Sequence, residues 1–149
     1  MKHRIVVLFF IIMCLSMGVI IYFLTRSEHI YLNQWIGPLR DTSFYLFLQT
    51  LVHNLNLPYW VVYSLPDALW MMALIMIVLM IWEFKLDTRS IFWVALSTLV
   101  GVLLEISQAI HVLPGTYDNT DLIFIFIGAL IPISISILKL HTCKTTQSL

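Results

Sequence analysis

The sequence predicts an all-α integral membrane protein, with four transmembrane helices and an amphipathic helix in the outer interface. Of its 149 residues, 60% are hydrophobic and only 11% are charged, and the mean hydropathy is +0.94. A soluble domain carries roughly 25% charged residues, so this chain has too few polar side chains to cover its apolar ones. Four apolar runs of about 20 residues, the length that crosses a bilayer, account for the excess. We therefore expect a single transmembrane domain over residues 1–149.

The first predicted helix covers residues 5–24. It follows a basic N-terminal segment that contains Lys2 and Arg4. A cleavable signal peptide has a shorter apolar region and an Ala-x-Ala-like site, which is absent here. We therefore expect an uncleaved first membrane helix.

The other predicted spans cover residues 65–82, 91–110 and 122–140. Cytoplasmic ends of membrane helices carry an excess of Lys and Arg. With four spans, most basic residues fall on the side of the two termini: Lys2, Arg4, Lys85, Arg89, Lys139 and Lys144. Only Arg26 and Arg40 fall on the other side. This distribution predicts that both termini are cytoplasmic.

Residues 42–55 are expected to form the interfacial helix. The apolar residues recur at helical spacing: Phe44, Phe47, Leu48, Leu51 and Leu55. Gln49, Thr50, His53 and Asn54 lie on the other face, and Asp41 and Thr42 precede the helix as N-cap candidates. A fifth span through residues 42–63 is the alternative, but it would place His53 and Pro58 in lipid, where polar groups are costly.

The third predicted span carries a polar stripe. Ser97, Gly101, Glu105 and Gln108 follow one another at spacings of four, four and three, so they share one helix face. We expect this face to turn toward the bundle. A carboxylate as deep as Glu105 is costly in lipid and usually faces the protein interior or a water-filled cavity, although a packing role with hydrogen bonds to a neighbouring helix also explains it.

Two further segments carry acids at predicted helix starts. Asp118 and Asp121 follow a Pro-Gly turn, in positions typical of an N-cap and a first-turn carboxylate. Ser64 and Asp67 stand in the same relation, with Pro66 between them. Capping alone would explain these acids, because the helix dipole favours negative charge at an N-terminus.

The predicted topology places these polar residues near one outer surface. The candidate pocket contains Glu105, Gln108, Asp121, Asp118 and Asp67. Separate helix ends that supply polar groups at one depth are how a membrane site is built, provided that the helices pack closely. No reaction can be assigned to this pocket from the residue types alone.

The segment from Glu105 to Gly128 resembles the signature of the VanZ-like family of small polytopic membrane proteins. The matching residues are Glu105-x-x-Gln108, a Pro-Gly turn, Asp118-x-x-Asp121-Leu122 and Gly128-Ala129. The usual pattern has an Arg where this chain has Gly115, and an Asn where it has Ile125. The resemblance implies a bacterial cytoplasmic (inner) membrane location and a link to low-level resistance to teicoplanin, a lipophilic glycopeptide.

Three functions are compatible with this pattern. The favoured hypothesis is an envelope protein whose outer pocket binds or modifies a membrane lipid or lipid-linked glycan. The alternative is a non-catalytic assembly or scaffold protein, in which the acids are helix caps and interhelical contacts. A solute carrier would need polar groups through the full depth of the membrane, and the inner half offers few beyond Ser134 and Ser136.

The sequence points to no metal site and no cofactor. His53 and His111 lack zinc-ligand spacing with another His or Cys, and the acids alone would suit Mg²⁺ or Ca²⁺ better. Cys14 and Cys143 are expected at different depths, which excludes a disulfide. The formal net charge is zero, so we expect no nucleic-acid partner.

Overall fold

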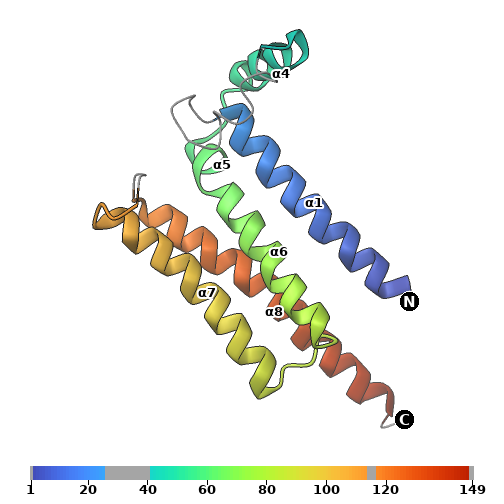
Figure 1. The fold of residues 1–149 in the computed structure, drawn as a ribbon. Helices are drawn as coiled ribbons and strands as arrows, with labels where there is room; N and C mark the ends of the chain where they lie inside the picture. Colours follow the sequence, from blue (N-terminus) through green and yellow to red (C-terminus); the bar gives the residue numbers. More distant parts are fainter. Residues whose placement is uncertain (1, 26–40, 114–116, 148–149) are drawn as a thin grey trace.

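The computed structural model describes residues 2–25, 41–113 and 117–147, and every regular element in these ranges is a helix. The predicted all-α class is therefore confirmed for this part of the chain. In chain order the helices are α1 (Lys2–Thr25), α4 (Ser43–Asn54), α5 (Tyr59–Tyr63), α6 (Leu65–Ile81), α7 (Thr88–Ala109) and α8 (Asn119–Gln147), as labelled in Figure 1.

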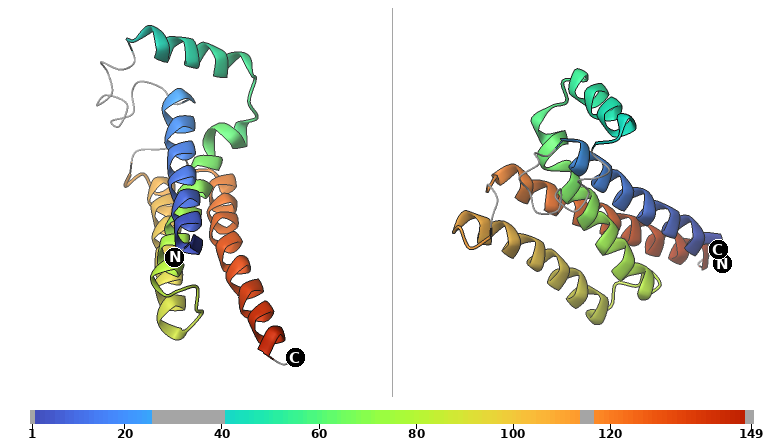
Figure 2. Two further views of the ribbon diagram at one scale, coloured as in Figure 1. Left: turned by 90° about the vertical axis from the view of Figure 1, so that its right-hand side faces the viewer. Right: turned by 45° about the horizontal axis from the view of Figure 1, so that its top comes forward.

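Helix α6 is the centre of the bundle. It packs against α1 on one side and against α7 and α8 on the other (Figures 1 and 2). The start of α1, the end of α8 and the α6–α7 connection lie at one end of the bundle, which we call the terminal end. Helix α5, the first turns of α6 and α8, and the last turn of α7 lie at the opposite end, which we call the acidic end.

The hydrophobic core lies on two faces of α6. One face packs against α7 and α8 through a cluster of buried residues: Met71, Ile75, Val78, Leu79, Val94, Ile125 and Ala129. The other face packs against α1, where Val7, Ile11 and Cys14 contact Ala73. Because α6 is covered on both sides, its sequence is apolar all round, as expected for a helix inside a bundle.

The outer surfaces of the long helices are apolar. Exposed side chains include Phe9 on α1, Leu103 on α7 and Leu130 on α8. Three helical segments are long and apolar enough to cross a membrane, namely Arg4–Thr25, Thr88–Ala109 and Asn119–Leu138, whereas α6 is shorter, with 17 residues. A surface so rich in exposed hydrophobic side chains fits lipid rather than water.

Residues 42–63 form two short helices instead of one long one. Helix α4 has 12 residues and none of them is buried, and a turn that contains Asn56, with φ of 44°, separates it from the five-residue α5. Thr42 caps α4, as the sequence suggested, by accepting a hydrogen bond from the backbone N–H of Tyr45. The Tyr45 hydroxyl in turn donates to the Phe23 carbonyl at 2.6 Å, which ties α4 to the end of α1. The turn breaks the continuous helix that a fifth span would require.

Candidate functional site

Three of the sequence-predicted site residues meet at the acidic end. Asp67 lies in the first turn of α6, Glu105 lies near the end of α7, and Asp121 lies in the first turn of α8. One carboxylate oxygen from each lies within 4.8 Å of the other two. Glu105 and Asp121 are each only 6% exposed, and Asp67 is half-buried. We call these three residues the acidic triad.

Close helix packing brings the triad together. Gly128 on α8 lies against the backbone of Ala68, the neighbour of Asp67, and Gly101 on α7 faces Met71 and Ile125. A side chain at position 128 would meet the α6 backbone and hold α8 further from α6. The stripe predicted on α7 therefore does face the bundle, since Gly101 and Glu105 both lie on that side.

The described cationic residues lie away from the triad. Arg4 begins α1, Lys85 and Arg89 lie around the start of α7, and the remaining described lysines are at the start of α1 and in the last turns of α8. Glu83 pairs with Arg4 at 2.8 Å and with Lys85 at 3.4 Å. These exposed pairs are at the terminal end.

Within the triad, Asp121 gives the strongest indication of a bound ligand. Its Oδ1 atom is buried and makes no hydrogen bond to any residue that the structure describes. Burial of a carboxylate oxygen without a donor is costly. An arrangement of this kind stabilises the fold poorly by itself and fits a group that receives a ligand.

Asp118 does not belong to the triad. Its Oδ1 accepts a hydrogen bond from the backbone N–H of Thr120 at 2.8 Å, as expected for an acid at a helix start. This hydrogen bond lowers the pKa of the Asp118 carboxyl. The pKa of Tyr59 is raised by loss of solvent and by the neighbouring Asp118 carboxylate, with a smaller contribution from Asp121. Tyr59 of α5 therefore lies near the Asp118 carboxylate.

The remaining predicted residues have weaker roles in the geometry. Gln108 is half-buried about one turn beyond Glu105. Ser64 precedes α6, as expected, but the prediction that it caps this helix is wrong, because its hydroxyl makes no capping hydrogen bond. Ser64 has helical backbone angles, φ −100° and ψ −29°, instead of the extended ones typical of an N-cap residue.

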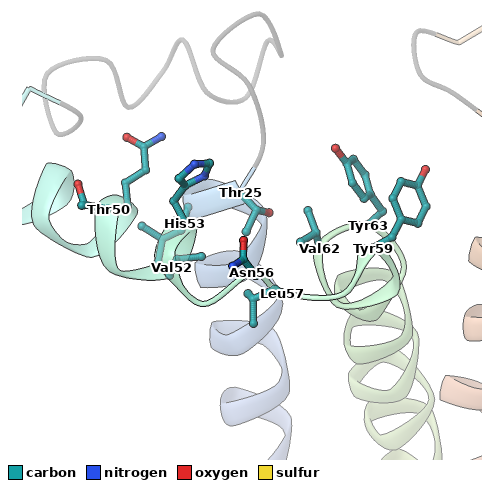
Figure 3. Close-up of a pocket in the computed structure, with 11 residues that line it drawn as sticks. Thr25, Thr50, Val52, His53, Asn56, Leu57, Tyr59, Val62 and Tyr63 are labelled. Carbon is teal, nitrogen blue, oxygen red and sulfur yellow. The ribbon is translucent and has the colours of Figure 1, made fainter.

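A cleft that sequence reasoning did not identify opens beside the acidic end. It has a volume of about 650 Å³ and lies between the end of α1, the polar face of α4 and α5 (Figure 3). Its polar lining residues are Thr25, Gln49, Thr50, His53, Asn56, Tyr59 and Tyr63. Tyr59 and Tyr63 stack with their ring centroids 4.3 Å apart. The polar face of α4 was visible in the sequence, but its pairing with α5 depends on the turn between them.

Comparison with protein families, with curated proteins and with solved structures finds no match to this chain.

Proposed function

We propose that the protein is a four-span membrane protein of the bacterial envelope that binds the headgroup of a lipid or lipid-linked glycan at its acidic end. The observation that carries the proposal is the acidic triad, in which three helices bring carboxylates within 4.8 Å of one another. Ionisable groups inside a membrane bundle are expensive and are usually functional.

The path of the chain supports a count of four spans. Helices α1, α7 and α8 have the length of membrane spans, and α6 connects the acidic end to the terminal end between them (Figure 1). If those three helices cross the bilayer, α6 must cross it too. Its 17 residues extend roughly 26 Å, slightly less than a typical hydrocarbon core of about 30 Å.

The proposed orientation places the acidic end outside. The described Lys and Arg residues lie at the terminal end, and such residues favour the cytoplasmic side. In this orientation the triad and the cleft face the outer surface of a bacterial cytoplasmic membrane, at the depth of lipid headgroups.

The cleft supports a headgroup as the ligand. Its hydroxyl, amide and imidazole groups suit a polar, oxygen-rich molecule, and Tyr59 in its wall lies near the Asp118 carboxylate. The resemblance of residues 105–128 to VanZ-like proteins agrees with an envelope function, and it extends the proposal to susceptibility to lipophilic glycopeptides.

A lipid-binding assay tests the proposal. Full-length protein in detergent micelles is titrated with phospholipids and with a lipid-linked glycan, and the thermal midpoint and native mass spectra are recorded. We expect at least one of these ligands to bind, and we expect His53→Ala and Asp121→Asn to weaken its binding while Glu83→Gln at the terminal end does not. Equal binding by all variants, or no binding at all, would contradict the proposal.

Cell growth distinguishes the scaffold alternative. If the acids serve assembly only, Asp121→Asn should remove the protein from the membrane or from a larger complex. If the proposal is right, the variant is present at the normal level and is inactive, so that any protection against teicoplanin conferred by the wild-type chain is lost.

A further inference from the structure

The acidic triad has the ligand chemistry of a hard divalent cation. Ca²⁺ and Mg²⁺ are bound by carboxylate, carbonyl and water oxygens, and the triad supplies one carboxylate oxygen from each of three helices. The three ligands come from α6, α7 and α8, so a bound cation would also join these helices.

The spacing of the oxygens fits a cation of the size of Ca²⁺. Three atoms no more than 4.8 Å apart share a point that lies within about 2.8 Å of each (4.8 Å divided by √3). Ca²⁺ binds oxygen at about 2.3–2.6 Å and Mg²⁺ at about 2.0–2.1 Å. At this upper limit, Ca²⁺ fits after shifts of a few tenths of an ångström, which is less than Mg²⁺ would need.

Asp121 gives an independent reason to expect a ligand. It is 6% exposed, and its Oδ1 has no hydrogen-bond donor among the described residues. A buried carboxylate usually contacts a partner charge or a metal. A cation from solution would serve as such a partner for Asp121.

From these observations we infer that Asp67, Glu105 and Asp121 bind a divalent cation, with Ca²⁺ preferred over Mg²⁺. Three close carboxylates repel one another when ionised, and a cation between them offsets this repulsion. Asp67 is half-buried and forms the accessible side of the site. Water fills the remaining coordination positions, and, if the proposed function is right, a phosphate oxygen of the headgroup replaces one of these waters.

Terbium luminescence tests the site directly. Tb³⁺ resembles Ca²⁺ in its ligand preference and emits when nearby Tyr or Trp side chains are excited, and Tyr63 lies one turn before Asp67. Full-length protein in detergent is stripped with EDTA, transferred to EDTA-free buffer and titrated with Tb³⁺, and Ca²⁺ and Mg²⁺ then compete. We expect saturable emission that Ca²⁺ displaces at lower concentration than Mg²⁺, and a thermal midpoint that rises with Ca²⁺ but not with KCl of equal ionic strength.

Matched variants locate the site. We expect Asp121→Asn, Glu105→Gln and Asp67→Asn each to weaken cation binding at least about tenfold, and Asp118→Asn, an acid at the same end but outside the triad, to leave it unchanged. Asp67→Asn is informative even if the two buried variants do not fold, because Asp67 is partly exposed. Wild-type protein that shows no Ca²⁺ competition and no Ca²⁺-dependent midpoint, or triad variants that bind as wild type does, would overturn the inference.

The cation site and the lipid-binding function can fail separately. Cation binding is measured in micelles without added lipid, so a positive result stands even if no lipid or glycan binds. Lipid binding that is unchanged by Ca²⁺ or EDTA would support the proposed function. If Ca²⁺ also fails to compete with Tb³⁺ in the same protein, the cation site is refuted and the lipid-binding function stands.

Discussion

Gly128 of α8 lies directly against the backbone of Ala68 in α6. A Cβ atom at position 128 would collide with the Ala68 carbonyl oxygen and would lie 3.0 Å from the Ala68 Cα and carbonyl carbon. Asp67 immediately precedes Ala68 in α6, and Asp121 lies two helical turns before Gly128 on the same face of α8. The close approach of the two backbones is therefore what allows their carboxylates to meet.

Substitution of Gly128 should disturb the α6–α8 contact more than substitution of Gly101 disturbs its own surroundings. Gly128→Ala meets rigid backbone, whereas Gly101→Ala meets the flexible end of the Met71 side chain. We expect Gly128→Ala to destabilise the protein by about 1–3 kcal/mol, and Gly101→Ala to have a small effect, because alanine also improves helix propensity. Thermal unfolding in detergent compares the two, and equal midpoints would contradict the packing argument.

Asp121→Asn should not destabilise protein that is free of divalent cations. The wild-type side chain buries a carboxylate oxygen with no donor among the described residues, beside two other carboxylates. Removal of one charge relieves their repulsion, and groups held for function are often kept at a cost in stability. With EDTA present, we expect the thermal midpoint of the variant to equal or exceed that of wild type. A drop of several degrees would mean that Asp121 serves the fold.

Two buried serines should respond oppositely to alanine. Ser64 and Ser90 are both fully buried, but the Ser64 hydroxyl has no partner among the described residues. The Ser90 hydroxyl donates to the Lys85 carbonyl at 2.7 Å and accepts from the Asp87 N–H at 3.0 Å. We expect Ser64→Ala to be neutral or slightly stabilising and Ser90→Ala to cost about 1–2 kcal/mol. Chemical or thermal unfolding measures both, and a larger loss for Ser64→Ala would refute this account.

The start of α7 should contribute to stability in a pH-dependent way. Asp87 and Ser90 form a reciprocal capping box, and the hydrogen bond from the Ser90 N–H lowers the pKa of Asp87. A carboxyl with a lowered pKa in the folded state stabilises the protein above its ordinary value, near 3.9, and loses this effect as the pH falls through the folded-state pKa. We expect Asp87→Ala to lower the thermal midpoint at pH 7 and to match wild type in strong acid. Asp87→Asn, which caps without titrating, should reduce the pH dependence, and an unchanged pH profile in either variant would contradict this role.

Labelling of single cysteines should place α4 and the α6–α7 connection on opposite sides of the membrane. In a Cys143→Ser background, native Cys14 is buried and should react slowly. We expect Thr50→Cys in intact cells to react with a membrane-impermeant maleimide, and Thr88→Cys to react only after the membrane is opened. Labelling of both positions from the same side would contradict the four-span topology.

The sequence allowed much of the fold to be predicted because lipid imposes simple rules. Each predicted apolar run matches a helix, apart from Trp82 and Ile110, which lie one residue beyond the ends of α6 and α7. A backbone in hydrocarbon must satisfy its own hydrogen bonds, and a helix does so. The spacing of Gly101 and Glu105 also correctly placed them on one inward face. Helix α5 was missed because its five residues follow a turn at Asn56, which has no strong local signature.

The sequence identified the acids of the candidate site, but it did not show which of them meet in the folded protein. Asp118 and Asp121 are three residues apart at the same helix start and had similar local explanations. In the structure the Asp118 carboxylate accepts a hydrogen bond from the Thr120 N–H. The Asp121 carboxylate instead lies close to those of Glu105 and Asp67. The choice between them depends on the rotation of α8 about its axis, which its contact with α6 sets.

By itself, the sequence determined the all-helical class, the position of the apolar segments and the presence of costly acids near helix ends. These properties depend on composition and on contacts within a few residues, so they are readable along the chain. Only the tertiary structure decided that Asp67, Glu105 and Asp121 form a triad and that α4 and α5 enclose a cleft. The physical reason is that helix rotation and approach are set by side chains far apart in the sequence, such as Gly128 against Ala68.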